Sequence, residues 1–177
     1  MSGHNKWSKI KHKKGAEDAK KSKLYSVLVR QITMEVKGAN GDANSPRVRT
    51  LIDKARAANM PNENIDRAIK KAQGAGGETY TEILFEGYGP GGVALIIEGI
   101  TDSKNRANAE IKHAMEEFGG SLGTPGSASW AFMKGPEGWV ASSPLPIPET
   151  DAEKLGELID ALEELEDVKT VYHAAQE

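Results

Sequence analysis

The sequence predicts an α+β fold: an N-terminal three-helix domain followed by a small α/β layer domain, with a mixed or antiparallel sheet and helices on one face. Up to about residue 73, apolar residues recur at steps of three and four, which is typical of helices. Beyond the glycine-rich stretch from Gly74 to Gly77, aromatic and β-branched runs predict strands. The sign of the net charge changes at the same stretch.

The charge of the chain is divided between its two parts. Residues 1–77 contain 17 Lys+Arg and 7 Asp+Glu, a net charge of +10, whereas residues 78–177 contain 6 and 19, a net charge of -13. A glycine-rich stretch between segments of opposite charge is typical of a linker. We therefore expect two domains: residues 1–77, basic and helical with a flexible N-terminal arm, and residues 78–177, acidic and α/β.

The first domain is expected to begin with a flexible arm from Ser2 to Lys14, which is rich in lysine and has no helical period. A helix is predicted from Ala16 to Lys37, ending at Gly38. Its inward face consists of Tyr25, Leu28, Val29, Ile32 and Val36.

Two shorter helices are predicted next. Ser45 as N-cap and Pro46 as first helical residue begin the second, which ends at Asn59-Met60-Pro61. Asn62 is the candidate N-cap of the third, which ends at Gly74. Their inward residues are Val48, Leu51, Ile52 and Ala55, then Ile65, Ala68, Ile69 and Ala72.

In the second domain the order of elements is predicted as ββαββαβ. Strands from Tyr80 to Glu86 and from Val93 to Ile100 form a hairpin, and a helix follows to about Phe118. The later elements are strands at 128–133 and 138–141, a Pro-rich loop at 144–148, a helix at 152–165 and a strand at 168–173.

Composition excludes several classes of function. The chain has no cysteine, which rules out disulfides, thiolate metal sites and cysteine nucleophiles. No apolar run approaches the roughly 20 residues that span a bilayer, and no apolar stretch typical of a signal peptide follows the first lysines. We expect a cytoplasmic protein that does not bind a membrane.

The strongest functional feature is a group of eight lysines within the first 23 residues, interleaved with His4, Trp7 and His12. Lysines release counterions from phosphates, and a tryptophan can stack on an unpaired base. A solvated, solubilising tail is the alternative. We expect nucleic-acid contacts from His4, Lys6, Trp7, Lys9, Lys11, His12, Lys13, Lys14, Lys20, Lys21, Lys23, Arg47, Arg49 and Arg56.

Motifs for catalysis or for cofactors are weak. The four histidines include no pair at the i, i+4 spacing of metal ligands, so we expect no metal site. Gly89-Pro90-Gly91-Gly92 lacks the Gly-Lys-Ser/Thr ending of a phosphate-binding loop and is better explained as a hairpin turn. No serine lies in a Gly-x-Ser-x-Gly sequence. We expect no catalytic residues, no cofactor and no enzyme activity.

Several segments resemble the YebC family, which also includes a mitochondrial translational activator of cytochrome oxidase. They are Gly3-His4-Asn5-Lys6-Trp7, Ala58-Asn59-Met60-Pro61, Gly87-Tyr88-Gly89-Pro90-Gly91-Gly92, Thr101-Asp102 with Asn105-Arg106, and Gly126-Ser127 with Trp130 and Phe132. The resemblance runs nearly end to end, but only about Lys134 to Pro148 stands where typical members carry a third domain. The chain looks like a shortened, two-domain form.

The resemblance implies a DNA-binding transcriptional regulator, and some members act in translation on the ribosome. Our leading hypothesis is therefore a non-enzymatic regulator of gene expression that binds DNA. A ribosome-associated translation factor that binds structured RNA remains the alternative, because phosphate contacts carry no sequence information. A third hypothesis is that the acidic domain binds a basic protein partner.

Overall fold

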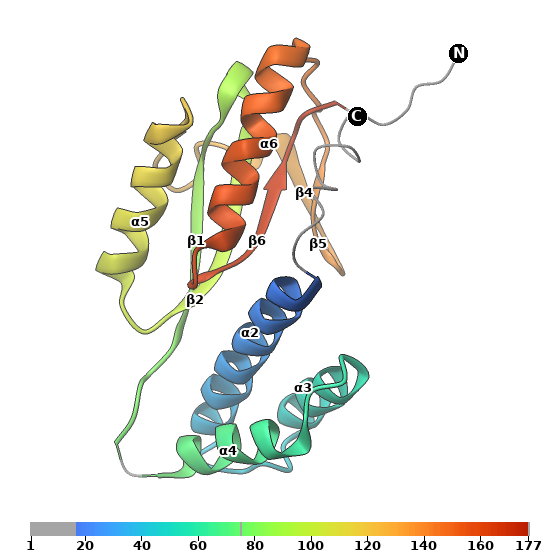
Figure 1. Ribbon diagram of the computed structural model, residues 1–177, viewed down its shortest axis with the longest axis vertical. Helices are drawn as coiled ribbons and strands as arrows, with labels where there is room; N and C mark the ends of the chain where they lie inside the picture. Colours follow the sequence, from blue (N-terminus) through green and yellow to red (C-terminus); the bar gives the residue numbers. More distant parts are fainter. Residues whose placement is uncertain (1–16, 75, 177) are drawn as a thin grey trace. The chain divides into compact units, whose positions relative to one another are not determined.

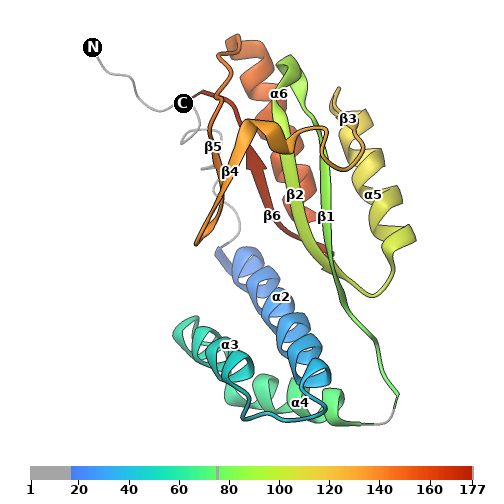
Figure 2. The same cartoon turned by 180° about the vertical axis from the view of Figure 1, so that it is seen from behind.

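The computed structural model describes residues 17–74 and 76–176 (Figures 1 and 2). The chain divides into two compact units. Among the described residues, the helical unit comprises residues up to Glu82 together with Ile100–Ser103, and the sheet unit comprises Ile83–Gly99 and residues from Lys104 onward. The predicted functional domains, residues 1–77 and 78–177, stay a prediction. The predicted α+β class is confirmed.

The helical unit contains three helices, α2 (Glu17–Gly38), α3 (Pro46–Ala57) and α4 (Asn62–Gln73), as predicted. The apolar faces expected from the sequence meet in one core, in which Ile32, Val36 and Val48 are fully buried. Burial of such side chains contributes about 1.5–3 kcal/mol each relative to exposure. The amphipathic pattern therefore accounts for the packing of all three helices.

The turn between α3 and α4 differs in one detail from the prediction. Asn59 has a positive φ of 60°, and the amide of Met60 donates to the carbonyl of Ala55 at 2.9 Å, which ends α3. Asn62 was expected to be the N-cap of α4, but it is the first helical residue and Pro61 holds the cap position. The carbonyl of Pro61 accepts from the amide of Asn64 at 2.9 Å, so the backbone and not an Asn side chain begins the helix.

The sheet unit is built on a four-stranded sheet in the order β3-β1-β2-β6. Its strands are β1 (Thr81–Tyr88), β2 (Ala94–Thr101), β3 (Ser121–Leu122) and β6 (Val168–His173), and the 3-10 turn η1 (Pro90–Gly92) joins β1 to β2. The pairs β1–β3 and β2–β6 are antiparallel. Gly87 permits the close approach of β3, because a Cβ there would lie 2.5 Å from the carbonyl oxygen of Ser121.

The two faces of this sheet are covered differently (Figures 1 and 2). Helices α5 (Lys104–Glu117) and α6 (Glu149–Glu164) cover one face, where Leu95 and Ile97 of β2 contribute to the main core. On the other face Ala94 and Ile96 pack with Phe132 in a second cluster beneath the hairpin of β4 (Phe132–Gly135) and β5 (Gly138–Ala141). The helices thus lie on one face, as predicted.

The strand predicted at 128–133 is partly wrong. Ser129–Ala131 form a 3-10 turn, η2, and the strand begins only at Phe132. The cause is the buried carboxylate of Glu86, which accepts hydrogen bonds from the amides of Gly126, Ala128 and Ser129 at 2.7–2.8 Å. Amides that converge on one carboxylate cannot also form a strand ladder. The two-residue strand β3 was also missed, because so short a segment carries no periodicity.

Candidate nucleic-acid interface

Helix α3 presents cationic side chains along both edges of its exposed surface. Its buried residues Val48 and Ala55 lie seven positions apart, which is close to two helical turns. Arg47 and Lys54 repeat this step on one side, and Arg49 and Arg56 repeat it on the other, all exposed. Two cationic rows therefore flank the solvent-facing side of the helix.

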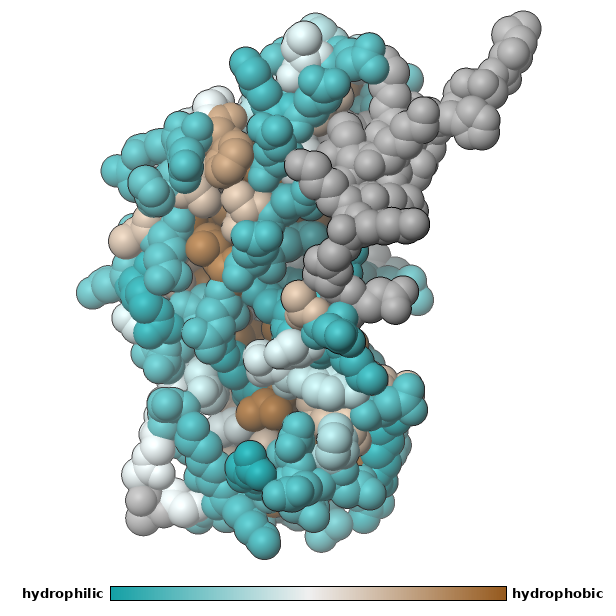
Figure 3. Space-filling model, in the orientation of Figure 1, coloured by the Kyte–Doolittle hydropathy of each residue, from teal (hydrophilic) through white to brown (hydrophobic). Residues whose placement is uncertain are grey.

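Most of these side chains are available to an external anion. Within the described part of the chain, Arg47, Arg49 and Lys54 make no ion pair. Arg56 lies 3.9 Å from Asp53, but both side chains are largely exposed, so this pair contributes little and can open. In Figure 3, hydrophilic residues cover most of the visible surface of the helices.

The N-terminal end of α2 lies next to the C-terminal end of α3. The Tyr25 hydroxyl is within hydrogen-bond distance of the carbonyl oxygens of Ala58 and Asn59, at 3.1 and 2.6 Å. One turn earlier, the ammonium group of Lys21 lies 5.9 Å from the centre of the Tyr25 ring. The helix end that leads into the lysine-rich segment is therefore held against the end of α3.

The predicted site residues fall into three groups. Arg47, Arg49 and Arg56 are on α3, and Lys20, Lys21 and Lys23 are on the first turns of α2, with Lys20 and Lys21 exposed and Lys23 half-buried. The remaining predicted residues, His4, Lys6, Trp7, Lys9, Lys11, His12, Lys13 and Lys14, lie outside the described residues. The assignment of all of them to nucleic-acid binding stays a prediction.

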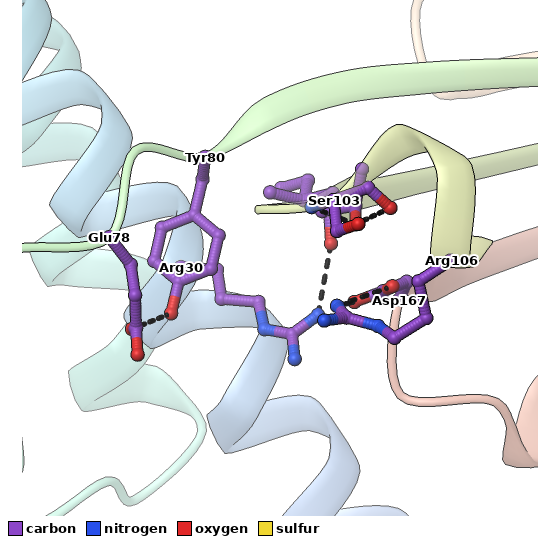
Figure 4. A network of polar contacts seen from close by, with 8 residues as sticks. Arg30, Glu78, Tyr80, Ser103, Arg106 and Asp167 are labelled. Atoms are coloured by element: carbon purple, nitrogen blue, oxygen red, sulfur yellow. Dashed lines mark hydrogen bonds and ion pairs between the residues drawn. The ribbon is translucent and has the colours of Figure 1, made fainter.

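One arginine that the charge pattern grouped with this surface is internal. Arg30 is 7% exposed, and its Nη1 donates to the carbonyl oxygen of Ile100 at 2.9 Å (Figure 4). Its guanidinium also lies 5.5 Å from the centre of the Tyr80 ring. Arg30 therefore does not belong to the exposed basic surface, since its charge is used inside the unit.

Two lysines are also held by the protein itself. Lys37 donates to the carbonyl oxygens of Gly77 and Glu78 at 3.1 and 2.8 Å, and Lys71 contacts the Glu78 carboxylate at 2.6 Å. The same carboxylate accepts from the Tyr80 hydroxyl (Figure 4). Burial and this hydrogen bond raise the pKa of Tyr80 to about 12, whereas the hydrogen bonds from Lys71 and Tyr80 lower the pKa of Glu78.

The helical unit carries less net charge than residues 1–77. Residues 15–82 and 100–103, the helical unit, contain 12 Lys+Arg and 10 Asp+Glu, a net charge of only +2. Five further lysines lie in residues 1–14 without any acidic residue. The excess of positive charge therefore lies in residues 1–14 and, locally, on α3, because the net charge of the helical unit is small.

Sequence reasoning missed Lys54 as a member of the surface. The signal was present, because Lys54 follows Arg47 by the same seven residues that separate the buried Val48 and Ala55. The acidic neighbour Asp53 offsets the charge of Lys54 in the sequence pattern. Sequence alone also could not separate Arg30, Lys37 and Lys71, which the fold uses internally, from the exposed cations of α3.

Residues 17–74 and 76–176 contain no group of three or more His, Asp or Glu side chains arranged to hold a metal ion. None of the helices described is long and apolar enough to cross a membrane.

Two family models match the chain. The model described as the TACO1/YebC protein N-terminal domain matches residues 5–75, which include α2, α3 and α4. The model described as the TACO1/YebC second and third domain matches residues 80–136, from the start of β1 to the end of β4. Together these matches cover well over half of the chain.

Three relatives are similar in sequence to this chain over most of its length. A probable transcriptional regulatory protein of Chlorobaculum parvum is 49% identical over 176 residues, which cover 98% of this chain and 68% of the relative. Proteins with the same name from Petrotoga mobilis and Finegoldia magna are 47% and 52% identical, over 90% and 76% of this chain. This chain spans only 61% of the length of the Petrotoga mobilis protein and 56% of the length of the Finegoldia magna protein.

A solved structure has the same fold. The crystal structure of a conserved hypothetical protein from Aquifex aeolicus matches with a TM-score of 0.83 and 32% sequence identity, covering 96% of each chain.

Proposed function

Since this chain belongs to the TACO1/YebC family, we propose that it is a cytoplasmic, DNA-binding regulator of transcription without catalytic activity. The names of its relatives support the regulatory role. The observation that carries the proposal is the pair of cationic rows on α3, where Arg47, Arg49 and Lys54 have no ion-pair partner among the described residues.

The mechanism is electrostatic attraction to phosphates. Arginine and lysine side chains displace condensed counterions from the backbone of the nucleic acid, and this release dominates non-specific affinity. The five lysines from Lys6 to Lys14 supply one set of contacts, and α3 supplies a second, rigid set. The rigid set fixes the orientation of the protein, since phosphate contacts determine position and not sequence preference.

The test is the salt dependence of binding to a duplex, measured with the full chain by fluorescence anisotropy. If six to eight phosphates are neutralised, the slope of log affinity against log salt is roughly -5 to -7. Glutamine in place of Lys6, Lys9, Lys11, Lys13 and Lys14 makes the slope less negative by roughly 4 to 5. A slope near zero for the unaltered chain contradicts the proposal.

A further inference from the structure

A groove with a volume of about 270 Å³ lies on the helical unit beside Arg47. Its lining comes from both neighbouring helices: Gln31, Met34 and Glu35 of α2, Arg47, Thr50 and Leu51 of α3, and Glu82 at the start of β1. Each helix contributes positions i, i+3 and i+4, which lie on one helical face. The groove is therefore a direct result of how α2 and α3 pack.

The lining of the groove combines apolar and polar side chains. Met34 and Leu51 are half-buried and supply apolar surface. The side chains of Gln31, Glu35, Arg47 and Glu82 make no hydrogen bond or ion pair with other residues in the part of the chain that the structure describes. An apolar surface with a few polar groups beside it is the general form of a ligand site.

We infer that this groove binds one unpaired guanine of the nucleic acid held by α3, an inference that rests on the proposed function. The carboxylate oxygens of Glu35 and Glu82 accept hydrogen bonds, so they call for a ligand that donates. The Watson–Crick edge of guanine offers two adjacent N–H donors, whereas that of uracil or thymine offers one between two acceptors. Pairing in a duplex buries this edge, so the base must be unpaired.

The other parts of a nucleotide fit the same lining. The flat face of a base packs on Leu51 and on the thioether of Met34, which contacts aromatic rings favourably. Arg47 is exposed at the groove and can hold the attached phosphate. The volume of 270 Å³ lies just below the roughly 300–1,000 Å³ of sites for drug-sized ligands, which suits a single base.

Two simpler occupants fit less well. A phosphate inside the groove would face the carboxylates of Glu35 and Glu82, and like charges repel. A lysine side chain from a protein partner would face the guanidinium of Arg47 and would leave the apolar surface of Met34 and Leu51 without a flat partner. A base with donor groups satisfies all three features together.

The test uses DNA hairpins with one common stem and equal phosphate number, whose loops contain only thymidine, one deoxyguanosine, or one deoxyinosine at the same position. Anisotropy titrations should show about tenfold tighter binding for the guanosine loop than for the thymidine loop, since a good bidentate base contact discriminates by that order. Inosine lacks one of the two donors, so it should lose most of this preference.

The variant Glu35→Gln/Glu82→Gln should reduce the preference for guanosine to below about twofold. It should also bind the thymidine hairpin more tightly, because two carboxyl groups that repel phosphates are removed. Asp66→Asn is the matched control, since Asp66 is exposed on α4 and does not line the groove. It should retain the full preference. Circular dichroism checks that each variant is folded.

The outcomes separate the inference from the proposed function. Equal affinity for all three loops, or a preference that survives in the double variant, overturns the groove as a base site while phosphate-driven binding stands. Failure to bind any hairpin or duplex overturns both. A reduced preference in the double variant with a full preference in Asp66→Asn supports the groove.

Discussion

The carboxylate of Glu86 provides the sharpest stability prediction in the sheet unit. Its side chain is 6% exposed, and its two oxygens accept from the amides of Gly126, Ala128 and Ser129 at 2.8, 2.8 and 2.7 Å. Burial alone would raise the pKa of Glu86, but the amide donors outweigh burial and lower it below the ordinary value. The folded state therefore holds this group as an anion.

Replacement of Glu86 by glutamine preserves shape and removes the charge. The amide oxygen can still accept from Ala128 and Ser129, but its NH₂ group then faces the N–H of Gly126. One charge-assisted hydrogen bond is lost and the others weaken, so the free energy of unfolding should fall by about 2–4 kcal/mol. With a slope of roughly 2 kcal/mol/M, the urea midpoint should fall by about 1–2 M.

The control for this variant is Glu157→Gln, an exposed glutamate on α6 of the same unit. It should change the free energy of unfolding by less than about 0.5 kcal/mol. Hydrogen exchange of the amides of Gly126, Ala128 and Ser129 should accelerate in Glu86→Gln alone. A midpoint equal to that of the control, with unchanged exchange, would refute the reasoning.

The lowered pKa of Glu86 determines how the free energy of unfolding changes with pH. A carboxyl with a lower pKa in the folded state stabilises the fold fully above its unfolded pKa of about 4.3, and this contribution is lost as pH falls through the folded value. The difference between the unaltered chain and Glu86→Gln should therefore shrink in acid below about pH 4.

Two further predictions concern the helical unit. Arg30→Met removes the hydrogen bond to Ile100 and should lower the free energy of unfolding by about 1–3 kcal/mol. It should leave the salt slope of duplex binding unchanged, since Arg30 is 7% exposed. A change of about 1 in that slope would show that Arg30 contacts a phosphate. In an ultraviolet titration of the tyrosines, Tyr80 should ionise only at about pH 12, and Tyr80→Phe should remove that step. Because the pKa of Tyr80 is raised in the folded state, the contribution of its hydroxyl to stability is lost as pH rises through that value. Ionisation of Tyr80 near pH 10 would contradict its hydrogen bond to Glu78.

Much of the fold could be predicted because its elements have strong periodic patterns. The inward face from Leu28 to Val36 determined α2, and the strand at Val168–His173 was predicted with the bounds that the structure gives. The turn at Ser129–Ala131 could not be predicted, because its alternating pattern resembles a strand and the carboxylate that bends it comes from Glu86, about 40 residues earlier.

The candidate site was less predictable for a related reason. Sequence patterns show the sign of charge but not what neutralises it. In the sequence, Arg30 and Lys71 resemble Arg47 and Arg49. In the fold, however, Arg30 contacts Ile100 and Tyr80, and Lys71 forms an ion pair with Glu78. Ile100 lies 70 residues from Arg30, so no local pattern could have identified it. Glu78 lies only seven residues from Lys71, but that spacing spans the end of α4 and has no periodic signal.

The salt slope of a matched pair of triple variants tests the central claim most directly. Arg47→Gln/Arg49→Gln/Arg56→Gln removes three exposed cations from α3, and Lys104→Gln/Lys154→Gln/Lys169→Gln removes three exposed cations from the sheet unit. If α3 binds phosphates, the first variant should have a slope less negative by roughly 3, and the second should keep the slope of the unaltered chain. Equal slopes for the two variants would contradict the claim that α3 forms the nucleic-acid interface.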